Sequence, residues 1–273
     1  MTAKALFFDV FGTVVDWRSG VAREAEAVLA PRGHKLDWLA FADAWRGQYQ
    51  PAMEEVRAGR MPFCKLDVLH RHNLERILPH FGISKLPEDV ARELNLAWHR
   101  LDGWPDAAPG LARLRQRCLL APVSNGNISL MVDVARRNGF PWDAILGAET
   151  AGDYKPKPRV YLAACEAFDL PPADCMMVAA HTNDLLAAAK CGLRTAHIAR
   201  LGLVVARGFR AQDRVPRKTV AARDIDHQRD VAVRHRREQA APAQAGQAGC
   251  GVGPAVEPVP GQIELARDVL GKF

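Results

Sequence analysis

Asp9 directly follows an apolar run from Ala5 to Phe8, and Gly12 and Thr13 come shortly after it. The run has no polar face, which is typical of a buried parallel strand. A carboxylate just past the end of such a strand lies where open α/β sheets place their ligand crevice. Gly12 permits a tight turn there, and the Thr13 hydroxyl can hold the carboxylate in place. Taken alone, the pattern fits a nucleophilic aspartate and a structural turn aspartate equally well.

Three later stretches carry a hydroxyl and amides, then a lysine, then an acid. They are Ser124-Asn125-Gly126-Asn127, Lys155-Pro156 and the segment from His181 to Asp184. This order, at these separations, resembles the haloacid dehalogenase superfamily over about residues 3–199. The resemblance implies that Asp9 is the nucleophile.

Two departures from the superfamily's phosphatases define the chemistry that the resemblance implies. Those phosphatases carry a second aspartate two residues after the nucleophile and an acidic pair in the last motif. Here the corresponding positions hold Phe11 and Ala180. Mg²⁺ needs several hard oxygen ligands in near-octahedral geometry, so we expect a site with no metal and no other cofactor. The pattern resembles the L-2-haloacid dehalogenase branch, which has an aromatic residue at the position of Phe11.

The resemblance implies an (S)-2-haloacid dehalogenase, a hydrolase that converts short 2-haloalkanoates to (R)-2-hydroxy acids and halide. The Asp9 carboxylate would attack C2 and expel halide, and water would then cleave the aspartyl ester. Halide leaves without a proton, so the absence of an acid at Phe11 is consistent with this reaction. The alternatives are a magnesium-dependent phosphatase of the same superfamily and a member inactivated by its altered C-terminus.

The same resemblance places four residues of the later motifs around Asp9. Lys155 neutralises and orients the nucleophile, and Tyr161 bonds near the lysine or the substrate. Asp184 holds Lys155 or positions the hydrolytic water. His181 stands where the branch has asparagine, and it either acts on the water or the ester carbonyl or serves as a structural hydrogen-bonding residue.

Five further residues are expected to bind the substrate, again by the resemblance. Ser124 and Asn125 contact its carboxylate and halide, because a hydroxyl and an amide donate to anions without adding negative charge. Capping of the next helix is their alternative role. Arg46 binds the leaving halide, or else is an exposed helical arginine. Val10 and Phe11 supply backbone N–H groups and an apolar wall.

The elements that position these residues fall into two kinds. Residues 1–16 and 101–200 alternate strand and helix, which predicts a doubly wound, parallel α/β core with every motif at one sheet edge. Residues 17–100 have helical spacing and no strand signal, and we expect them to form a helical cap that excludes water. Within the cap, we expect one helix capped by Ser19 and another over residues 37–57.

The excess positive charge lies in the last part of the chain. The 273 residues hold 37 Lys+Arg and 31 Asp+Glu. Residues 1–199 contain 24 Lys+Arg and 23 Asp+Glu, whereas residues 200–273 contain 13 Lys+Arg and 8 Asp+Glu. A basic groove across the fold and a nucleic-acid partner are therefore not expected. Residues 201–273 are predicted to be an irregular, largely disordered tail, in which the final strand and helix usual in the family are hard to find. The tail is either an unusual extension or a translation in a shifted frame.

The remaining features bear on location and partners. The six cysteines have no C-x-x-C spacing, which predicts reduced thiols and a cytoplasmic protein. There is no long apolar run and no signal-peptide layout, so we expect no membrane association. The expected partner is a small 2-haloacid substrate, and the resemblance also implies a homodimer formed through the cap or a sheet edge.

Overall fold

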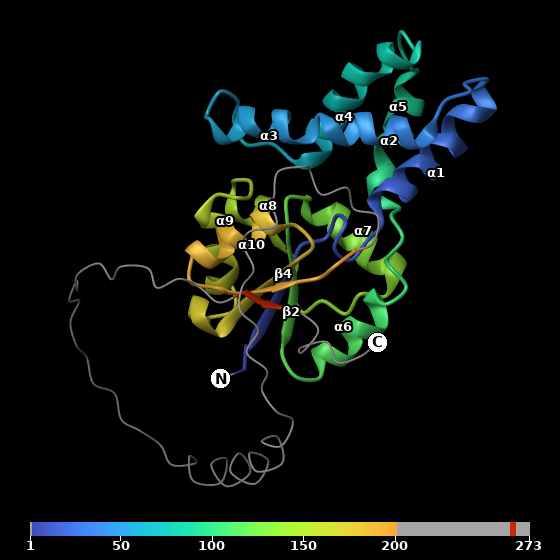
Figure 1. The fold of residues 1–273 in the computed structure, drawn as a ribbon. Helices are drawn as coiled ribbons and strands as arrows, with labels where there is room; N and C mark the ends of the chain where they lie inside the picture. The colour runs from blue at the N-terminus through green and yellow to red at the C-terminus, as the bar shows by residue number, and fades with distance from the viewer. Residues whose placement is uncertain (1, 201–262, 266–273) are drawn as a thin grey trace, which may run out of the picture. The chain divides into compact units, whose positions relative to one another are not determined.

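A six-stranded parallel sheet forms the centre of the computed structural model, which describes residues 2–200 and 263–265. The strands run in the order β3-β2-β1-β4-β5-β6, which places β1 inside the sheet (Figure 1). Their bounds are β1 (Ala5–Phe8), β2 (Leu119–Ser124), β3 (Leu146–Gly147), β4 (Cys175–Ala179), β5 (Arg194–His197) and β6 (Ile263–Leu265). The predicted doubly wound α/β fold is confirmed. No helix in the described part is both long and apolar enough to cross a membrane.

Alternate residues of β1 pack on opposite faces of the sheet. Leu6 and Phe8 join one apolar cluster, and Ala5 and Phe7 join another. The first cluster includes residues of α6 (Ala107–Arg115) and α7 (Ile128–Asn138); the second includes residues of α8 (Ala148–Ala151), α9 (Pro158–Glu166) and α10 (Thr182–Lys190). Burial on both faces explains why β1 has a continuous apolar sequence instead of an alternating one.

The register of the sheet brings the motif residues to one level. Phe8 pairs with Pro122 of β2 and with Val178 of β4. Asp9 therefore follows β1 at the edge where β2 and β4 also end. This is the sheet edge at which open α/β folds place their ligands.

Residues 17–99 contain only helices and their connections. These are α1 (Trp17–Leu29), η1 (Ala30–Arg32), α2 (Trp38–Gly47), α3 (Tyr49–Arg57), α4 (Leu66–Ile77), η2 (Leu78–Phe81), α5 (Glu88–Asn95) and η3 (Leu96–His99). Figure 1 shows α1 to α5 gathered in a group apart from the strands. Phe41, Trp45 and Leu74 of these helices have 1% or less of their surface exposed, and they belong to the same apolar cluster as Leu6 and Phe8 of β1.

The predicted N-cap of the first helix was wrong. Asp16, not Ser19, precedes the helix, and its carboxylate accepts the Ser19 N–H at 3.2 Å. An aspartate three residues before a free backbone N–H is an equally good cap. The helix therefore begins at Trp17, directly after the nucleophile motif.

The single helix predicted over residues 37–57 is in fact two, α2 and α3, with Gln48 between them. The reason is Pro51, which has no backbone N–H to donate and is tolerated only in the first turn of a helix. A new helix must therefore begin shortly before Pro51, and α3 begins at Tyr49.

The final strand that was hard to find in the sequence is present within the segment predicted to be irregular. Residues 263–265 form β6, which pairs in parallel with β5, with Thr195 opposite Ile263. A three-residue strand at the edge of a sheet has too short a sequence to show a period, so no pattern revealed it. The rest of the predicted disordered tail, residues 201–262 and 266–273, lies outside the described residues.

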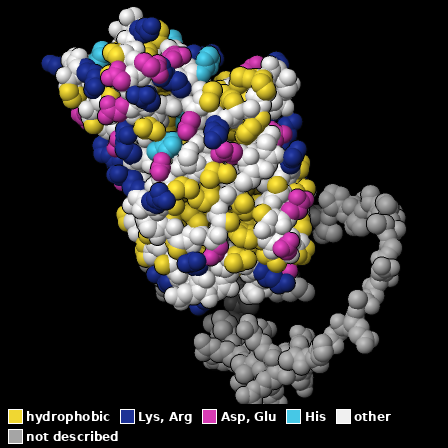
Figure 2. Space-filling model, turned by 180° about the vertical axis from the view of Figure 1, so that it is seen from behind, with side chains coloured by type: hydrophobic (Ala, Val, Ile, Leu, Met, Phe, Trp, Pro, Cys, Tyr) yellow, Lys and Arg dark blue, Asp and Glu magenta, His cyan; other side chains and the backbone are white. Residues whose placement is uncertain are grey.

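Charges of both signs are interspersed over the surface. On the face in Figure 2, Lys and Arg side chains lie among Asp and Glu side chains. Many charged side chains of the described residues are paired, such as Asp102, which contacts both Arg23 and Arg137. This distribution follows from the near balance of charges in residues 1–199.

His99, the last residue of η3, bonds to two carboxylates on different segments. Its Nε2 lies 3.1 Å from Asp67 of α4, and its Nδ1 lies 2.8 Å from Asp133 of α7. Both ring nitrogens can donate only in the imidazolium form. Burial opposes that form, but the hydrogen bonds to Asp67 and Asp133 raise the pKa of His99 above its ordinary value.

We therefore predict that this contact stabilises the fold more at lower pH. A raised folded pKa gives stability that is fully present below the unfolded pKa, near 6.5, and is lost as pH rises through the folded value. His99→Gln should lose about 1–3 kcal/mol of unfolding free energy at pH 6 and less at pH 8.5. Urea denaturation of both proteins at the two pH values measures this. An equal loss at both would contradict the charged contact.

Candidate active site

Asp9 lies in the turn after β1, with 7% of its surface exposed. Gly12 has φ of 83°, in the left-handed region that favours glycine, so the turn closes tightly. The Val10 carbonyl accepts the N–H of Thr13 at 3.1 Å. The Thr13 hydroxyl donates to Asp9 Oδ2 at 2.8 Å and accepts the N–H of Ala180 at 3.0 Å. These bonds fix the carboxylate between the ends of β1 and β4.

Lys155 links Asp9 to Asp184. Its Nζ lies 2.9 Å from Asp9 Oδ1 and 2.5 Å from Asp184 Oδ2. The Tyr161 hydroxyl, on α9, donates to Asp184 Oδ1 at 2.6 Å. The side chains of Lys155, Asp9 and Asp184 are all 10% exposed or less. The structure thus brings together these four predicted site residues.

Burial and charge shift the pKa values of the two acids in opposite directions. Burial would raise the pKa of Asp9, but the Lys155 ammonium and the His181 hydrogen bond hold it well below its ordinary value. Burial, together with the negative charge of Asp9, raises the pKa of Asp184. Burial opposes the charge on Lys155, but the two carboxylates raise its pKa. Asp9 is therefore held ionised, as a nucleophile requires, while Asp184 takes up a proton more readily.

His181 also contacts the Asp9 carboxylate. Its Nδ1 lies 2.9 Å from Asp9 Oδ2, and its side chain is 36% exposed. His181 is the residue before the first turn of α10, yet its side chain does not cap that helix. Its ring instead adds a second donor beside the Thr13 hydroxyl.

Ser124 and Asn125 are both buried, and neither caps the helix that follows. Asn127 occupies the N-cap position of α7. Ser124 Oγ accepts the N–H of Gly126 at 3.1 Å, and Asn125 Oδ1 accepts the N–H of Lys155 at 2.8 Å. Asn125 therefore positions the backbone of the loop that contains Lys155, a role that its sequence position did not reveal. The amide nitrogen of Asn125 lies 3.3 Å from the Met53 sulfur of α3.

The Arg46 guanidinium lies over two aromatic rings. It is 3.7 Å from the centre of the Tyr49 ring and 5.5 Å from that of Trp17. Its Nη1 is buried and has no hydrogen-bond partner among the described residues. The exposed helical arginine considered from the sequence does not match this environment. A buried, unpartnered guanidinium N–H can donate to an anion.

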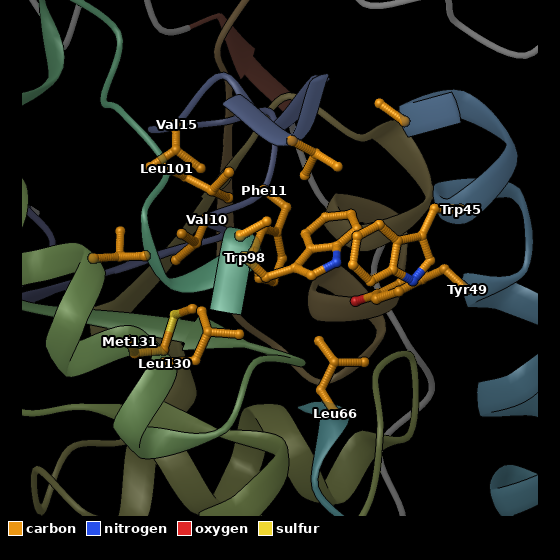
Figure 3. Close-up of a cluster of buried hydrophobic side chains, with 14 of the residues drawn as sticks. Val10, Phe11, Val15, Trp45, Tyr49, Leu66, Trp98, Leu101, Leu130 and Met131 are labelled. Carbon is orange, nitrogen blue, oxygen red and sulfur yellow. The ribbon is translucent and has the colours of Figure 1, made fainter. Parts of the chain in front are cut away.

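Val10 and Phe11 join this aromatic group to the nucleophile turn. Both are 2% exposed or less. The Phe11 ring contacts the Trp98 ring edge-on, with centroids 5.9 Å apart, and Trp98 also packs on Trp17. Figure 3 shows Val10, Phe11 and Trp98 within one apolar cluster that extends to Tyr49. Val10 and Phe11 are thus buried apolar neighbours of the nucleophile, and their role as an apolar wall for the substrate remains a prediction.

Three contacts that join the helical segment, residues 17–99, to the loops after β2 and before α9 were not predicted. Arg57 Nη1 donates to the Lys155 carbonyl at 3.2 Å. The Tyr154 hydroxyl donates to the Cys64 carbonyl at 2.8 Å. The third is the contact of Met53 with Asn125. No local sequence pattern predicts such contacts. Tyr154 could have been considered as a site residue, because it directly precedes Lys155 in the sequence.

The donor set at Asp9 does not suit Mg²⁺. The ammonium group of Lys155 lies between the two carboxylates that would otherwise be its ligands. Phe11 and Ala180 offer no side-chain oxygen. Mg²⁺ needs several oxygens around it in near-octahedral geometry, so the residues present do not fit this ion.

A doubly wound parallel sheet with a buried Asp–Lys–Asp cluster at its strand ends defines an α/β protein with an aspartate-centred site. Residues 3–192 match the model of a known family, the haloacid dehalogenase-like hydrolases. The chain belongs to this family.

Individual relatives agree with that assignment. The (S)-2-haloacid dehalogenase 4A of Burkholderia cepacia is 28% identical over 202 residues, which cover 73% of this chain and 84% of that protein. The structure of a defluorinating L-2-haloacid dehalogenase has 43% identity and a TM-score of 0.71, covering 73% of this chain and 82% of that one. The structure of the L-2-haloacid dehalogenase of Xanthobacter autotrophicus with chloropropionic acid covalently bound has 26% identity and a TM-score of 0.66. The match covers 74% of this chain and 80% of that one. The predicted resemblance to the L-2-haloacid dehalogenase branch is confirmed.

Proposed function

We propose that this chain hydrolyses short (S)-2-haloalkanoates to (R)-2-hydroxy acids and halide through a covalent ester on Asp9, without a metal ion. The observation that carries the proposal is the buried Asp9 carboxylate, held ionised by Lys155 at 2.9 Å. The names of the relatives support the substrate class. The unpartnered Nη1 of Arg46 supports an anionic ligand at the apolar wall.

The reaction has two steps. In the first, an Asp9 oxygen forms a bond to C2 from the side opposite the halogen, and the halide leaves with the bonding electron pair. In the second, water attacks the Asp9 carbonyl carbon and releases the hydroxy acid. C2 is attacked once only, so its configuration is inverted. Asp184, with its raised pKa, is the acceptor for the proton of the water.

The other residues bind and enclose the substrate. Arg46 stabilises the halide as it leaves, and the amide of Asn125 donates to the substrate anion, with Ser124 Oγ beside it. Val10 and Phe11 form the apolar wall. Residues 17–100 act as a cap over the core of residues 1–16 and 101–200, and the bond from Arg57 to Lys155 supports that role.

Location and assembly are part of the proposal. The described cysteines are all free, which supports the predicted reducing, cytoplasmic compartment. The homodimer remains a prediction from the resemblance.

Arg46→Met should lower kcat/KM for (S)-2-chloropropionate about 100-fold, because the developing halide charge loses its donor. Halide release at several substrate concentrations measures the effect. Arg60→Met is the matched control, since Arg60 is an exposed arginine of the same segment, paired with Glu55. Equal activity of the two variants would contradict the role of Arg46.

The test of the function itself compares two activities. We expect halide release from (S)-2-chloropropionate, but not from the (R) form, with EDTA present throughout. The phosphatase alternative predicts Mg²⁺-dependent release of phosphate from phosphate esters instead. Phosphate release without halide release would overturn the proposal. Absence of activity in both assays would favour the alternative of an inactive family member.

A further inference from the structure

The two oxygens of the Asp9 carboxylate have different partners. Among the described residues, Oδ1 accepts one hydrogen bond, from Lys155 Nζ at 2.9 Å. Oδ2 has two partners, the Thr13 hydroxyl at 2.8 Å and His181 Nδ1 at 2.9 Å. This asymmetry distinguishes the roles of the two oxygens in the proposed reaction.

Both partners of Oδ2 must be donors. Asp9 is ionised and can only accept, so the facing nitrogen of His181 carries a proton. Thr13 Oγ1 accepts the N–H of Ala180 at 3.0 Å, which directs its own proton toward Asp9. Two N–H or O–H groups therefore point at Oδ2.

A carboxylate oxygen offers about two lone pairs to donors. Both lone pairs of Oδ2 are engaged, whereas within the described part of the chain Oδ1 accepts only from Lys155 and keeps one lone pair free. We infer that Oδ1 is the atom that attacks the substrate, and that Oδ2 remains as the ester carbonyl oxygen in an oxyanion hole formed by Thr13 and His181. This inference rests on the proposed function and assigns the hydrolysis of the ester to a specific pair of donors.

Each step balances with this assignment. Oδ1 bonds to C2, the carbon–halogen bond breaks, and the electron pair leaves with the halide. Water then adds to Cγ of Asp9, losing a proton to the base, and negative charge develops on Oδ2. The Cγ–Oδ1 bond breaks, so Oδ1 departs as the hydroxyl oxygen of the product, which takes up a proton. The oxygen of the water stays on Asp9.

His181 therefore contributes chiefly to the second step. In the first step it contacts an oxygen that loses charge, whereas in the second it contacts the oxygen that gains charge. Removal of one oxyanion donor slows the step that needs it by about 100-fold or more. His181→Ala should thus form the ester at a near-normal rate and hydrolyse it slowly.

The experiment is a rapid-quench reaction of the full chain with (S)-2-chloropropionate. Halide is measured at each time, and the intact mass of the protein reports the ester as a gain of the substrate minus its halide. For His181→Ala we expect a halide burst of one per site, followed by accumulation of the ester and release of hydroxy acid about 100-fold slower than in the unchanged enzyme.

His181→Asn is the matched variant, because its amide N–H stands close to the position of Nδ1 and it cannot accept a proton. It should restore ester hydrolysis to within about tenfold of the unchanged enzyme. If His181→Asn fails as badly as His181→Ala, the ring acts as a proton acceptor and the donor assignment is overturned. Thermal melting of both variants excludes misfolding.

Two further results would overturn the inference by different routes. A slowed halide burst in His181→Ala, with no accumulated ester, would make Oδ2 the attacking oxygen. Absence of halide release from the unchanged enzyme would overturn the proposed function and this inference with it. The halide measurement therefore separates the two failures.

Discussion

Asp9→Asn is expected to reduce halide release by at least about 10⁴-fold, because the amide has no anionic oxygen to attack C2. The fold should remain, since Lys155 then keeps one carboxylate partner, Asp184, at 2.5 Å. Initial rates of halide release from (S)-2-chloropropionate, together with a thermal melt, measure both expectations.

The control for this change is Asp43→Asn. Asp43 is an aspartate of α2 whose side chain is 47% exposed and paired with Arg18. Exposed pairs of this kind contribute about 1 kcal/mol or less to stability, and Asp43 contacts no described site residue. Its variant should keep near-normal activity. Substantial activity in Asp9→Asn would mean that another group is the nucleophile.

Lys155→Met should destabilise the protein by about 3–5 kcal/mol at pH 7 as well as remove activity. The change leaves Asp9 and Asp184 buried with no cation between them, and an uncompensated buried charge costs about this much. Urea denaturation at pH 7 and pH 5, beside halide release, measures both effects.

The pKa shifts at the site determine how the stability loss of Lys155→Met changes with pH. In the unchanged protein Lys155 lowers the pKa of Asp9, so that contribution is present above the unfolded value of 3.8 and is lost only as pH falls through the lower folded one. In the variant, the two carboxylates raise each other's pKa, so the variant gains stability as pH falls. The difference in unfolding free energy between the unchanged protein and Lys155→Met should therefore become smaller from pH 7 to pH 5.

Lys157→Met is the matched control, because Lys157 lies two residues further along the same loop and is exposed. We expect a change in unfolding free energy of about 0.5 kcal/mol or less. If the loss of unfolding free energy caused by Lys155→Met is as large or larger at pH 5 than at pH 7, the buried-charge explanation is contradicted.

Part of the charged site could be predicted from the sequence because parallel strands end at a common edge of the sheet. Asp9 directly follows β1, and Asp184 lies in the first turn of α10, which follows β4, so the topology brings both acids to that edge. Lys155 was expected there only from the resemblance to a family. Its ion pairs with both acids show how that expectation is met.

The remaining features depend on contacts between segments far apart in the chain. The bond from Asn125 to the backbone of Lys155 joins loops that no periodicity relates. The environment of Arg46 depends on how α2 packs beside Trp17, and β6 is recognisable only through its pairing with β5. Tertiary packing, not local preference, decides these features.

The most direct test of the covalent mechanism is one turnover in water enriched with ¹⁸O, using excess enzyme over (S)-2-chloropropionate. Mass spectrometry of the peptide containing Asp9 then locates the label. Hydrolysis at the Asp9 carbonyl predicts ¹⁸O in the Asp9 carboxylate and none in the hydroxyl group of the product. Label in the product, with Asp9 unlabelled, would mean that water attacks C2 directly and would contradict the aspartyl ester.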